Sequence, residues 1–404
     1  MRSVEEHQRV VMEMIRARPA VAVALAEAQG LVLSDDVVAG LALPVFDNSA
    51  MDGYAVRAED TSDASLEHPV VLPVAEDIPA GRTDELTLQP GTAHRIMTGA
   101  PVPAGATAIV PVEDTDGSPH SVAIRQPGQP GAHIRRAGED VAPGTTVLRK
   151  GQVVTAAVLG LAAALGMAEL TVIPRQRVLV LSTGSELVSP GIPLRPGQIY
   201  ESNSIMLAGA VRDAGAEVIA VATAEDDVAQ FSSLVDRYAA EVDVIITSGG
   251  VSAGAYEVVK DAFGHGGMQG DHGVEFVKVA MQPGMPQGIG RVAGTTIVTL
   301  PGNPVSALVS FEVFIRPALR KAMGLPDPER PHHPAVLAES LTSPRGKRQF
   351  RRAILDRETG SVTSYGPPAS HHLRWLASAN GLLDIPEDVV EVSAGTQLQV
   401  WDLS

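Results

Sequence analysis

The stretch VDVIITSGGVSAGAYEVVKDAF, residues 242–263, combines residues that bind anions with one that repels them. Its apolar run, residues 242–247, predicts a buried strand, and a helix is expected to begin near Tyr256. The glycine-rich turn between them, residues 248–250, is of the kind whose backbone N–H groups bind anions. Glu257 adds a carboxylate in the first turn of that helix. Because an acid there also stabilises the helix dipole, the residues alone leave open whether Glu257 serves a ligand or only the helix.

Strand and helix patterns alternate around this stretch, from Arg177 to Leu319. Near-continuous Val/Ile strands separated by helices predict a parallel sheet covered by helices on both faces. Ligands bind such sheets at the carboxyl ends of the strands. Three of these ends carry small polar turns, residues 182–185, 248–254 and 301–304. The sequence therefore predicts a binding site where these three turns meet.

The rest of the chain predicts β structure and linking segments. Short apolar runs broken by Pro and Gly predict a β subdomain after Pro44, and the pattern is again β after Pro326. The apolar, Ala-rich run at residues 153–168 is expected to be a buried helix, since it is too short for a membrane span. The expected domains are an N-terminal helix packed on the α/β domain (1–23), a linking domain (24–43 and 139–174), a β-rich subdomain (44–138), the α/β domain (175–325) and a C-terminal β domain (326–404).

Composition and charge exclude several classes of function. The 404-residue chain has no cysteine, which excludes disulfides, thiolate zinc sites and cysteine nucleophiles. Its formal net charge of −16 argues against general nucleic-acid binding, because such binding relies on basic surfaces. The N-terminal segment is a charged amphipathic pattern and not a signal peptide, so a cytoplasmic protein that is not inserted in a membrane is expected.

Six motifs give the chain a family resemblance. In order they read FDNSAMDGYAVR (46–57), RIMTGAPVPAGATAIVPVED (95–114), RRAGED (135–140), STGSEL (182–187), SGGVSAG (248–254) and LPGNPVSA (300–307). Each is an ordinary Gly/Pro turn by itself, but the six in this order resemble the molybdopterin molybdenumtransferases, the family of MoeA and the gephyrin E domain, over essentially the whole chain. The resemblance implies an elongated homodimer with a MogA-like molybdopterin-binding α/β domain. It also implies Mg²⁺-dependent insertion of molybdate into adenylylated molybdopterin, with release of AMP.

This resemblance offers a role for Glu257. The substrate carries a phosphoanhydride and a dithiolene, so a nearby carboxylate would repel it unless a divalent cation lay between them. By resemblance, Glu186, Asp226 and Glu257 are therefore the expected magnesium ligands. A purely structural role stays open for two of them, since Glu186 also fits a helix-start pattern and Asp226 also fits a helix N-cap.

The resemblance also assigns the other site residues. Asp52, an ordinary Asp-Gly turn residue when considered alone, is implied to reach across the dimer into the cleft, and Asp140 is implied to face it. Lys278 is expected to neutralise phosphate. The predicted substrate-binding residues are Thr98, Gly99, Ser182, Thr183, Gly184, Ser185, Ser248, Gly249, Gly250, Ser252, Gly254, Pro301, Gly302, Asn303, Pro304 and Ser306.

Two departures from the family pattern weaken the expected oxyanion site. Gln282 and Met285 stand where the family usually carries lysines, and Glu257 replaces a commoner aspartate. Each lost charge-assisted hydrogen bond is expected to cost about 0.5–3 kcal/mol of binding free energy. Basic residues of the tail, such as Arg345, Lys347 and Arg348, are candidates to compensate, although such patches are usually solvated surface.

Function is therefore expected to follow one of two main alternatives. The first is an enzyme that inserts molybdate, as the resemblance implies. The second, by analogy with gephyrin, is a dimeric scaffold with weakened catalysis that binds peptide segments of a tubulin-like cell-division protein or of a membrane protein. A third idea, storage of the completed cofactor, ranks last because it leaves the acidic residues without a purpose.

Overall fold

The computed structural model describes residues 1–250, 258–263 and 273–404 of the chain. The chain divides into two compact units, one formed by residues 1–22, 30–32 and 171–404 and the other by residues 23–29 and 33–170. Within the described residues, no helix is long and apolar enough to cross a membrane.

The centre of the first unit is a six-stranded sheet with the order β16-β13-β17-β21-β20-β18. Strands β16 (Glu217–Ala224), β13 (Arg177–Thr183), β17 (Val244–Ser248) and β21 (Thr295–Leu300) are parallel, as predicted. Strands β20 (Pro286–Val292) and β18 (Gly273–Lys278) run antiparallel to their neighbours, so the prediction of a purely parallel sheet is wrong at this edge. The reason is that β20 turns directly back into β21 without a crossover helix.

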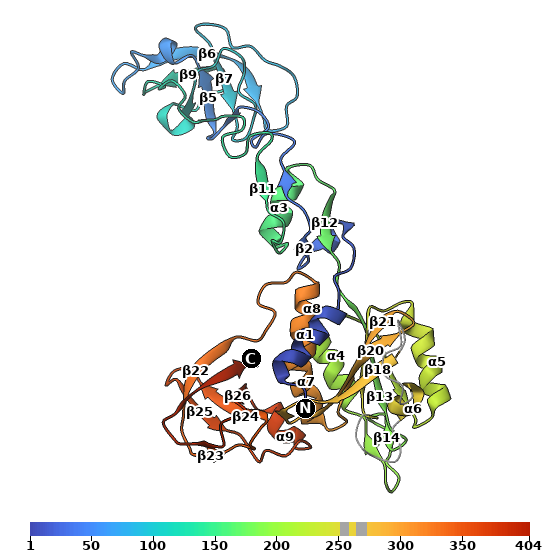
Figure 1. The fold of residues 1–404 in the computed structure, drawn as a ribbon. Coiled ribbons are helices and arrows are strands. Elements are labelled where there is room, and N and C mark those ends of the chain that lie inside the picture. The colour runs from blue at the N-terminus through green and yellow to red at the C-terminus, as the bar shows by residue number, and fades with distance from the viewer. Residues whose placement is uncertain (251–257, 264–272) are drawn as a thin grey trace. The chain divides into compact units, whose positions relative to one another are not determined.

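Helices cover both faces of this sheet (Figure 1). Because side chains alternate along a strand, Val178 and Val180 of β13 pack into one core while Leu179 and Leu181 pack into the other. The first core contains α1 (Val4–Met14), α4 (Asn203–Asp213), α7 (Pro304–Ser310) and α8 (Arg316–Ala322). The second contains α5 (Val228–Ala239) and α6 (Val258–Phe263).

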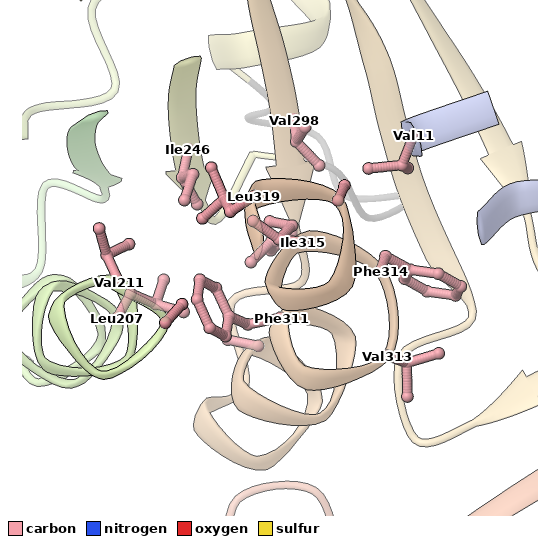
Figure 2. Packing of buried hydrophobic residues seen from close by; sticks show 14 of the residues in the cluster. Val11, Leu207, Val211, Ile246, Val298, Phe311, Val313, Phe314, Ile315 and Leu319 are labelled. Atoms are coloured by element: carbon pink, nitrogen blue, oxygen red, sulfur yellow. The ribbon is translucent and has the colours of Figure 1, made fainter. Parts of the chain in front are cut away.

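The helix after β21 is the largest contributor to the first core. A π-helical turn, Phe311–Ile315, joins α7 to α8 and is buried in all five of its residues. Figure 2 shows Phe311 and Ile315 packed between α4 and the strand residues Ile246 and Val298. This apolar packing fixes the start of α7, and therefore the turn that precedes it, against the carboxyl ends of the strands.

The C-terminal part of the first unit is a small closed barrel, consistent with the expected β fold. Strand β24 (Arg348–Asp356) pairs with both β25 (Ser361–Ser364) and β26 (Gly381–Ile385), and the barrel closes through β28 (Gln397–Asp402) and β22 (His332–Leu337). The helix α9 (Leu373–Ala377) and the pair β23 (Leu341–Thr342) and β27 (Glu391–Val392) complete it.

A short segment after β18 pairs with the barrel. The apolar run after residue 273 was expected to be one strand, but it divides into β18 and a separate strand, β19 (Met281–Gln282). Strand β19 pairs with β24 of the barrel. Residues 282–286 are thereby placed next to both domains. A short pair, β14 (Leu187–Val188) and β15 (Ile199–Tyr200), lies before α4.

The second unit contains a five-stranded sheet with the order β8-β5-β7-β6-β9. Its strands are β5 (Gly53–Val56), β6 (Val70–Ile78), β7 (Ala93–Ile96), β8 (Ala108–Pro111) and β9 (Ser121–Ile124), with the short 3-10 turns η1 (Ala58–Thr61) and η2 (Val112–Asp114). The remaining pairs are β10 (Ile134–Arg135) with β4 (Asn48–Ser49) and β11 (Thr146–Leu148) with β3 (Val37–Val38).

Three elements of the linking region complete the chain. They are α2 (Leu25–Ala28), α3 (Ala156–Ala164) and the sheet of β1 (Val21–Ala24), β12 (Glu169–Ile173) and β2 (Val32–Leu33). In α3 only Val158 and Ala162 are buried, so the expectation of a buried helix is wrong. Alanine raises the mean hydropathy of this segment without bulky side chains that must be buried, which is why composition misled the prediction.

Candidate functional site

A cavity of about 1030 Å³ lies at the carboxyl ends of β13, β17 and β21 in the first unit. Its walls include the turns that follow these strands, the segment 282–286 and the barrel segment 368–373. The predicted site residues that line it are Ser182, Thr183, Gly184, Glu186, Asp226, Ser248, Gly249, Gly250, Pro301, Gly302, Asn303, Pro304 and Ser306. The three strand-end turns therefore meet as the sequence predicts.

Other predicted residues lie elsewhere. Ser185 does not line the cavity, but its amide donates to Asp226 Oδ2 (3.1 Å) and its hydroxyl accepts from the Asp226 amide (2.9 Å), so it fixes Asp226 in place. Lys278 is exposed at the end of β18 and is not a lining residue. Ser252, Gly254 and Glu257 fall outside the described residues.

The Ser-Gly-Gly turn depends on a residue without a side chain at Gly249. Its φ is +97°, and a Cβ there would lie 2.8 Å from both the carbonyl oxygen and Oγ1 of Thr183. The Gly249 amide donates to the Leu300 carbonyl (3.1 Å). Because this amide is already used, the turn offers fewer free N–H groups to an anion than its sequence suggests.

The prolyl turn is also partly occupied by the protein itself. The Val305 amide donates to the Ser370 carbonyl (3.0 Å), and Asn303 Nδ2 donates to Ser370 Oγ (2.9 Å). Both contacts join the turn to the barrel, which gives Asn303 a structural role that the sequence did not indicate. Ser306 remains buried in the cavity wall.

The cavity wall carries acids and few groups that can be cationic. Glu186, Glu201 and Asp226 line it, and among the lining residues that the structure describes there is no lysine or arginine, only His371. Glu201 is 5% exposed and accepts hydrogen bonds from Ser182 and Ser204. Glu186 and Asp226 are therefore the two carboxylates left to act on a ligand. No group of three or more metal-binding side chains occurs among the described residues.

The two positions that depart from the family pattern do line the cavity. Gln282 Oε1 accepts a hydrogen bond from Gln349 Nε2 (3.2 Å), and Met285 lies in the same segment. The expected compensation by basic tail residues does not occur in this wall. Arg348 is paired with Glu5 and Asp384, and Arg345 lines a different cavity beside Met1 and Ser3.

The sequence prediction missed several cavity residues, among them Glu201, Asn203, Ser370 and His371. The run ESN at residues 201–203, between a strand and a helix, is a polar signal comparable to those that were used. Ser370 and His371 come from the barrel, and no local pattern connects them to the strand ends.

In the second unit, Asp52 contacts Thr98, the residue before Gly99. Asp52 Oδ1 accepts from the Thr98 amide and from Thr98 Oγ1, both at 2.7 Å. These two hydrogen bonds hold the pKa of Asp52 below its usual value, and the bond from the Thr98 amide has the larger effect. Asp140 is exposed in the same unit, and its amide donates to the Leu43 carbonyl.

The Asp-Gly pair at residues 52–53 is more than a turn signal. Gly53 begins β5, and a Cβ on it would lie 2.1 Å from the Val110 carbonyl oxygen of the neighbouring strand. Asp52 lies in the bend at residues 50–52, which is consistent with a turn signal, and strand packing adds a second reason for the glycine. Asp52 itself stays exposed just before β5.

Comparisons with known proteins cover the whole chain. Family models match for the MoeA N-terminal region, domains I and II (residues 2–166), a probable molybdopterin binding domain (179–321) and the MoeA C-terminal region, domain IV (334–403). The chain is 80% identical to molybdopterin molybdenumtransferase 2 of Mycobacterium tuberculosis over 100% of both chains. It is 38% identical to molybdopterin molybdenumtransferase 1 of the same organism, over 99% of this chain and 98% of the relative.

A solved structure agrees with these matches. The molybdopterin biosynthesis MoeA protein from Pyrococcus horikosii superposes with a TM-score of 0.81 at 30% identity, over 100% of this chain and 99% of the other. The predicted fold class, with α/β and β domains, and the prediction of an enzyme are confirmed. The chain belongs to the molybdopterin molybdenumtransferase family.

Proposed function

We propose that this enzyme inserts molybdate into adenylylated molybdopterin in a Mg²⁺-dependent reaction that releases AMP. The observation that carries the proposal is the cavity where the three strand-end turns meet, with Glu186 and Asp226 in its wall. Its volume of about 1030 Å³ is at the upper end of the usual range for ligand pockets, about 300–1,000 Å³, as a nucleotide joined to a pterin requires.

The charges in the wall support a requirement for a divalent cation. A phosphoanhydride beside Glu186 and Asp226 would be repelled, and no lysine or arginine among the described lining residues offsets that repulsion. Carboxylate oxygens are the ligands that Mg²⁺ prefers, so the donor set fits this ion. Glu186 and Asp226 would hold it, with Glu257 as the third expected ligand.

When bound, Mg²⁺ would neutralise charge on the phosphate oxygens. The chain's own residues then have two tasks. The Ser185 amide keeps the Asp226 carboxylate oriented, while the Ser185 hydroxyl accepts from the Asp226 amide. Thr183, whose Oγ1 is buried and has no partner among the described residues, offers a hydrogen bond to the substrate. Lys278 is proposed to approach the phosphate only if its exposed side chain turns toward the cavity.

We also propose that the active form is a homodimer. By family resemblance, Asp52 reaches the cleft from the β subdomain of the second subunit, Thr98 and Gly99 line the substrate pocket, and Asp140 of the linking domain faces the cleft. The Thr98 hydrogen bonds lower the pKa of Asp52 and fix its carboxylate, which suits a residue that orients a water or a metal-bound group.

The test is a turnover assay with purified protein, adenylylated molybdopterin, Mg²⁺ and a molybdate series. We expect AMP release and cofactor formation that saturate with molybdate and are abolished by Asp52→Asn. Substrate binding without turnover at any molybdate concentration would contradict the proposal.

A second candidate function is a scaffold with weakened catalysis. The described lining residues that favour it are Gln282 and Met285, because neither provides a positive charge for an oxyanion. The partner would be a peptide segment of a tubulin-like or membrane protein. If the dimer retains no such partner in pull-downs under mild salt, this candidate fails.

A further inference from the structure

One short segment of the cavity wall contacts three strand ends at once. Residues 201–204, which follow β15 and include the start of α4, bind Ser182 at the end of β13, Ser248 at the end of β17 and Gly302 after β21. These three strands are neighbours in the sheet. The segment therefore sets the relative positions of the turns that form the floor of the site.

The Asn203 amide has a defined orientation. Its Nδ2 donates to Ser248 Oγ (2.8 Å) and to the Gly302 carbonyl (2.6 Å). Because a carbonyl oxygen only accepts hydrogen bonds, the nitrogen has to face Gly302, and both of its protons are then used. The oxygen Oδ1 is buried and has no partner among the described residues.

The two serines consequently differ in what they offer a ligand. Ser182 Oγ donates its proton to Glu201 Oε1 (2.8 Å), so that hydroxyl has no proton left for an anion. Ser248 Oγ accepts from Asn203, so its proton stays available, and it meets no acceptor side chain or carbonyl among the described residues. Both residues line the cavity.

We propose that Asn203 is a positioning residue that aims the Ser248 hydroxyl proton into the cavity, where it donates to an oxygen of a tetrahedral oxyanion. This inference rests on the proposed function, which supplies two such oxyanions, the phosphate of AMP and molybdate. Glu201 has the opposite effect on Ser182, whose hydroxyl it withdraws from the ligand.

The test is a set of titrations of the full-length protein in the presence of Mg²⁺, with AMP and with molybdate in separate arms. Ser248→Ala and Asn203→Asp are each expected to weaken binding about tenfold in at least one arm, as loss of one charge-assisted hydrogen bond predicts. The double variant should bind no more weakly than Asn203→Asp alone, since the carboxylate introduced at position 203 already accepts the Ser248 proton and so removes the same bond. Ser182→Ala should weaken binding at most about threefold, and the exposed Ser189→Ala serves as the matched control.

The arm that weakens identifies the oxyanion. Additive losses in the double variant would overturn the positioning role of Asn203, and so would a loss for Ser182→Ala as large as that for Ser248→Ala. Either result would leave the proposed function standing. A wild-type protein that binds neither AMP nor molybdate would overturn the proposed function and this inference together. Thermal unfolding is measured for each variant, and Asn203→Ala replaces Asn203→Asp in the cycle if the latter does not fold.

Discussion

The carboxyl end of the α/β sheet and the loop that carries Asp52 are both predicted parts of the site, but they are built differently. In the cavity, polar side chains from different elements bind one another, as Ser182 binds Glu201 and Asn203 binds Ser248. Asp52 is exposed and is held by one residue, Thr98. A wall whose side chains hydrogen-bond to one another resists rearrangement, whereas an exposed carboxylate held by one neighbour can reorient toward a ligand.

This difference has consequences for substitution. In the cavity, removal of one group leaves its partners unpaired in a buried setting, so effects should be large and non-additive. At Asp52, solvent replaces a lost partner at small cost. The predictions below are arranged to test this contrast, beginning with the largest expected effect.

Asp226→Asn should lower AMP release by about 100-fold or more, because it removes a proposed Mg²⁺ ligand where charge must be compensated. Asparagine keeps an oxygen that can accept from the Ser185 amide, so the fold should be retained. Turnover is measured across a Mg²⁺ series, with Asp236→Asn on the exposed face of α5 as the control. Turnover equal to that of the control would exclude Asp226 from the metal site.

Gly249→Ala should lower the free energy of unfolding by about 1–3 kcal/mol and weaken AMP binding. The added Cβ would meet both Thr183 oxygens at 2.8 Å in a backbone conformation that favours glycine. The matched control is Gly197→Ala, because Gly197 has φ +84° but no neighbour within 4 Å of its Cβ. Equal losses in urea unfolding would show that backbone conformation, and not the cross-strand contact, determines the cost.

The same contrast explains how far the sequence could predict this molecule. Ser182, Ser248 and Pro301 were found because each ends a strand with a recognisable local pattern, and the sheet brings such ends together. Ser370 and His371 were not found, because they come from the barrel, which meets the cavity through contacts between distant segments such as the pairing of β19 with β24. Asp52 and Thr98 were identified by family resemblance, and the structure supplies the hydrogen bonds that join them.

The sequence also could not show which hydrogen-bonding groups are already paired within the protein. The glycine turn predicted an anion cradle, but whether an amide is free depends on its neighbours, and the Gly249 and Val305 amides are already paired. Similarly, the basic tail patch suggested compensating charge, yet Arg348 is used in ion pairs with Glu5 and Asp384. Residue type indicates the chemistry that is available, and tertiary contacts decide how much of it remains for a ligand.

Gln282→Lys should strengthen molybdate binding about tenfold, since a cation in the wall adds a charge-assisted hydrogen bond. The gain should shrink as salt is raised, because exposed charges are screened. Molybdate titration at two ionic strengths measures it, with Gln397→Lys at the exposed start of β28 as the control. An unchanged affinity would mean that Gln282 does not approach the oxyanion.

The smallest effect is expected at Thr98. Thr98→Val removes the hydroxyl donor to Asp52 but keeps the amide donor, so the pKa of Asp52 should rise toward its usual value without reaching it. Because the pKa of this carboxyl is lower in the folded chain than in the unfolded chain, its contribution to stability is present above the unfolded pKa of about 3.9 and is lost as pH falls through the folded value. The variant should lose that contribution at a higher pH than the wild type.

Carboxyl titration by NMR, with Thr92→Val as the control, measures the shift. If the pKa of Asp52 does not change, the Thr98 amide alone is sufficient to lower it. The Asp52 carboxylate would then be held as firmly as the groups of the cavity wall.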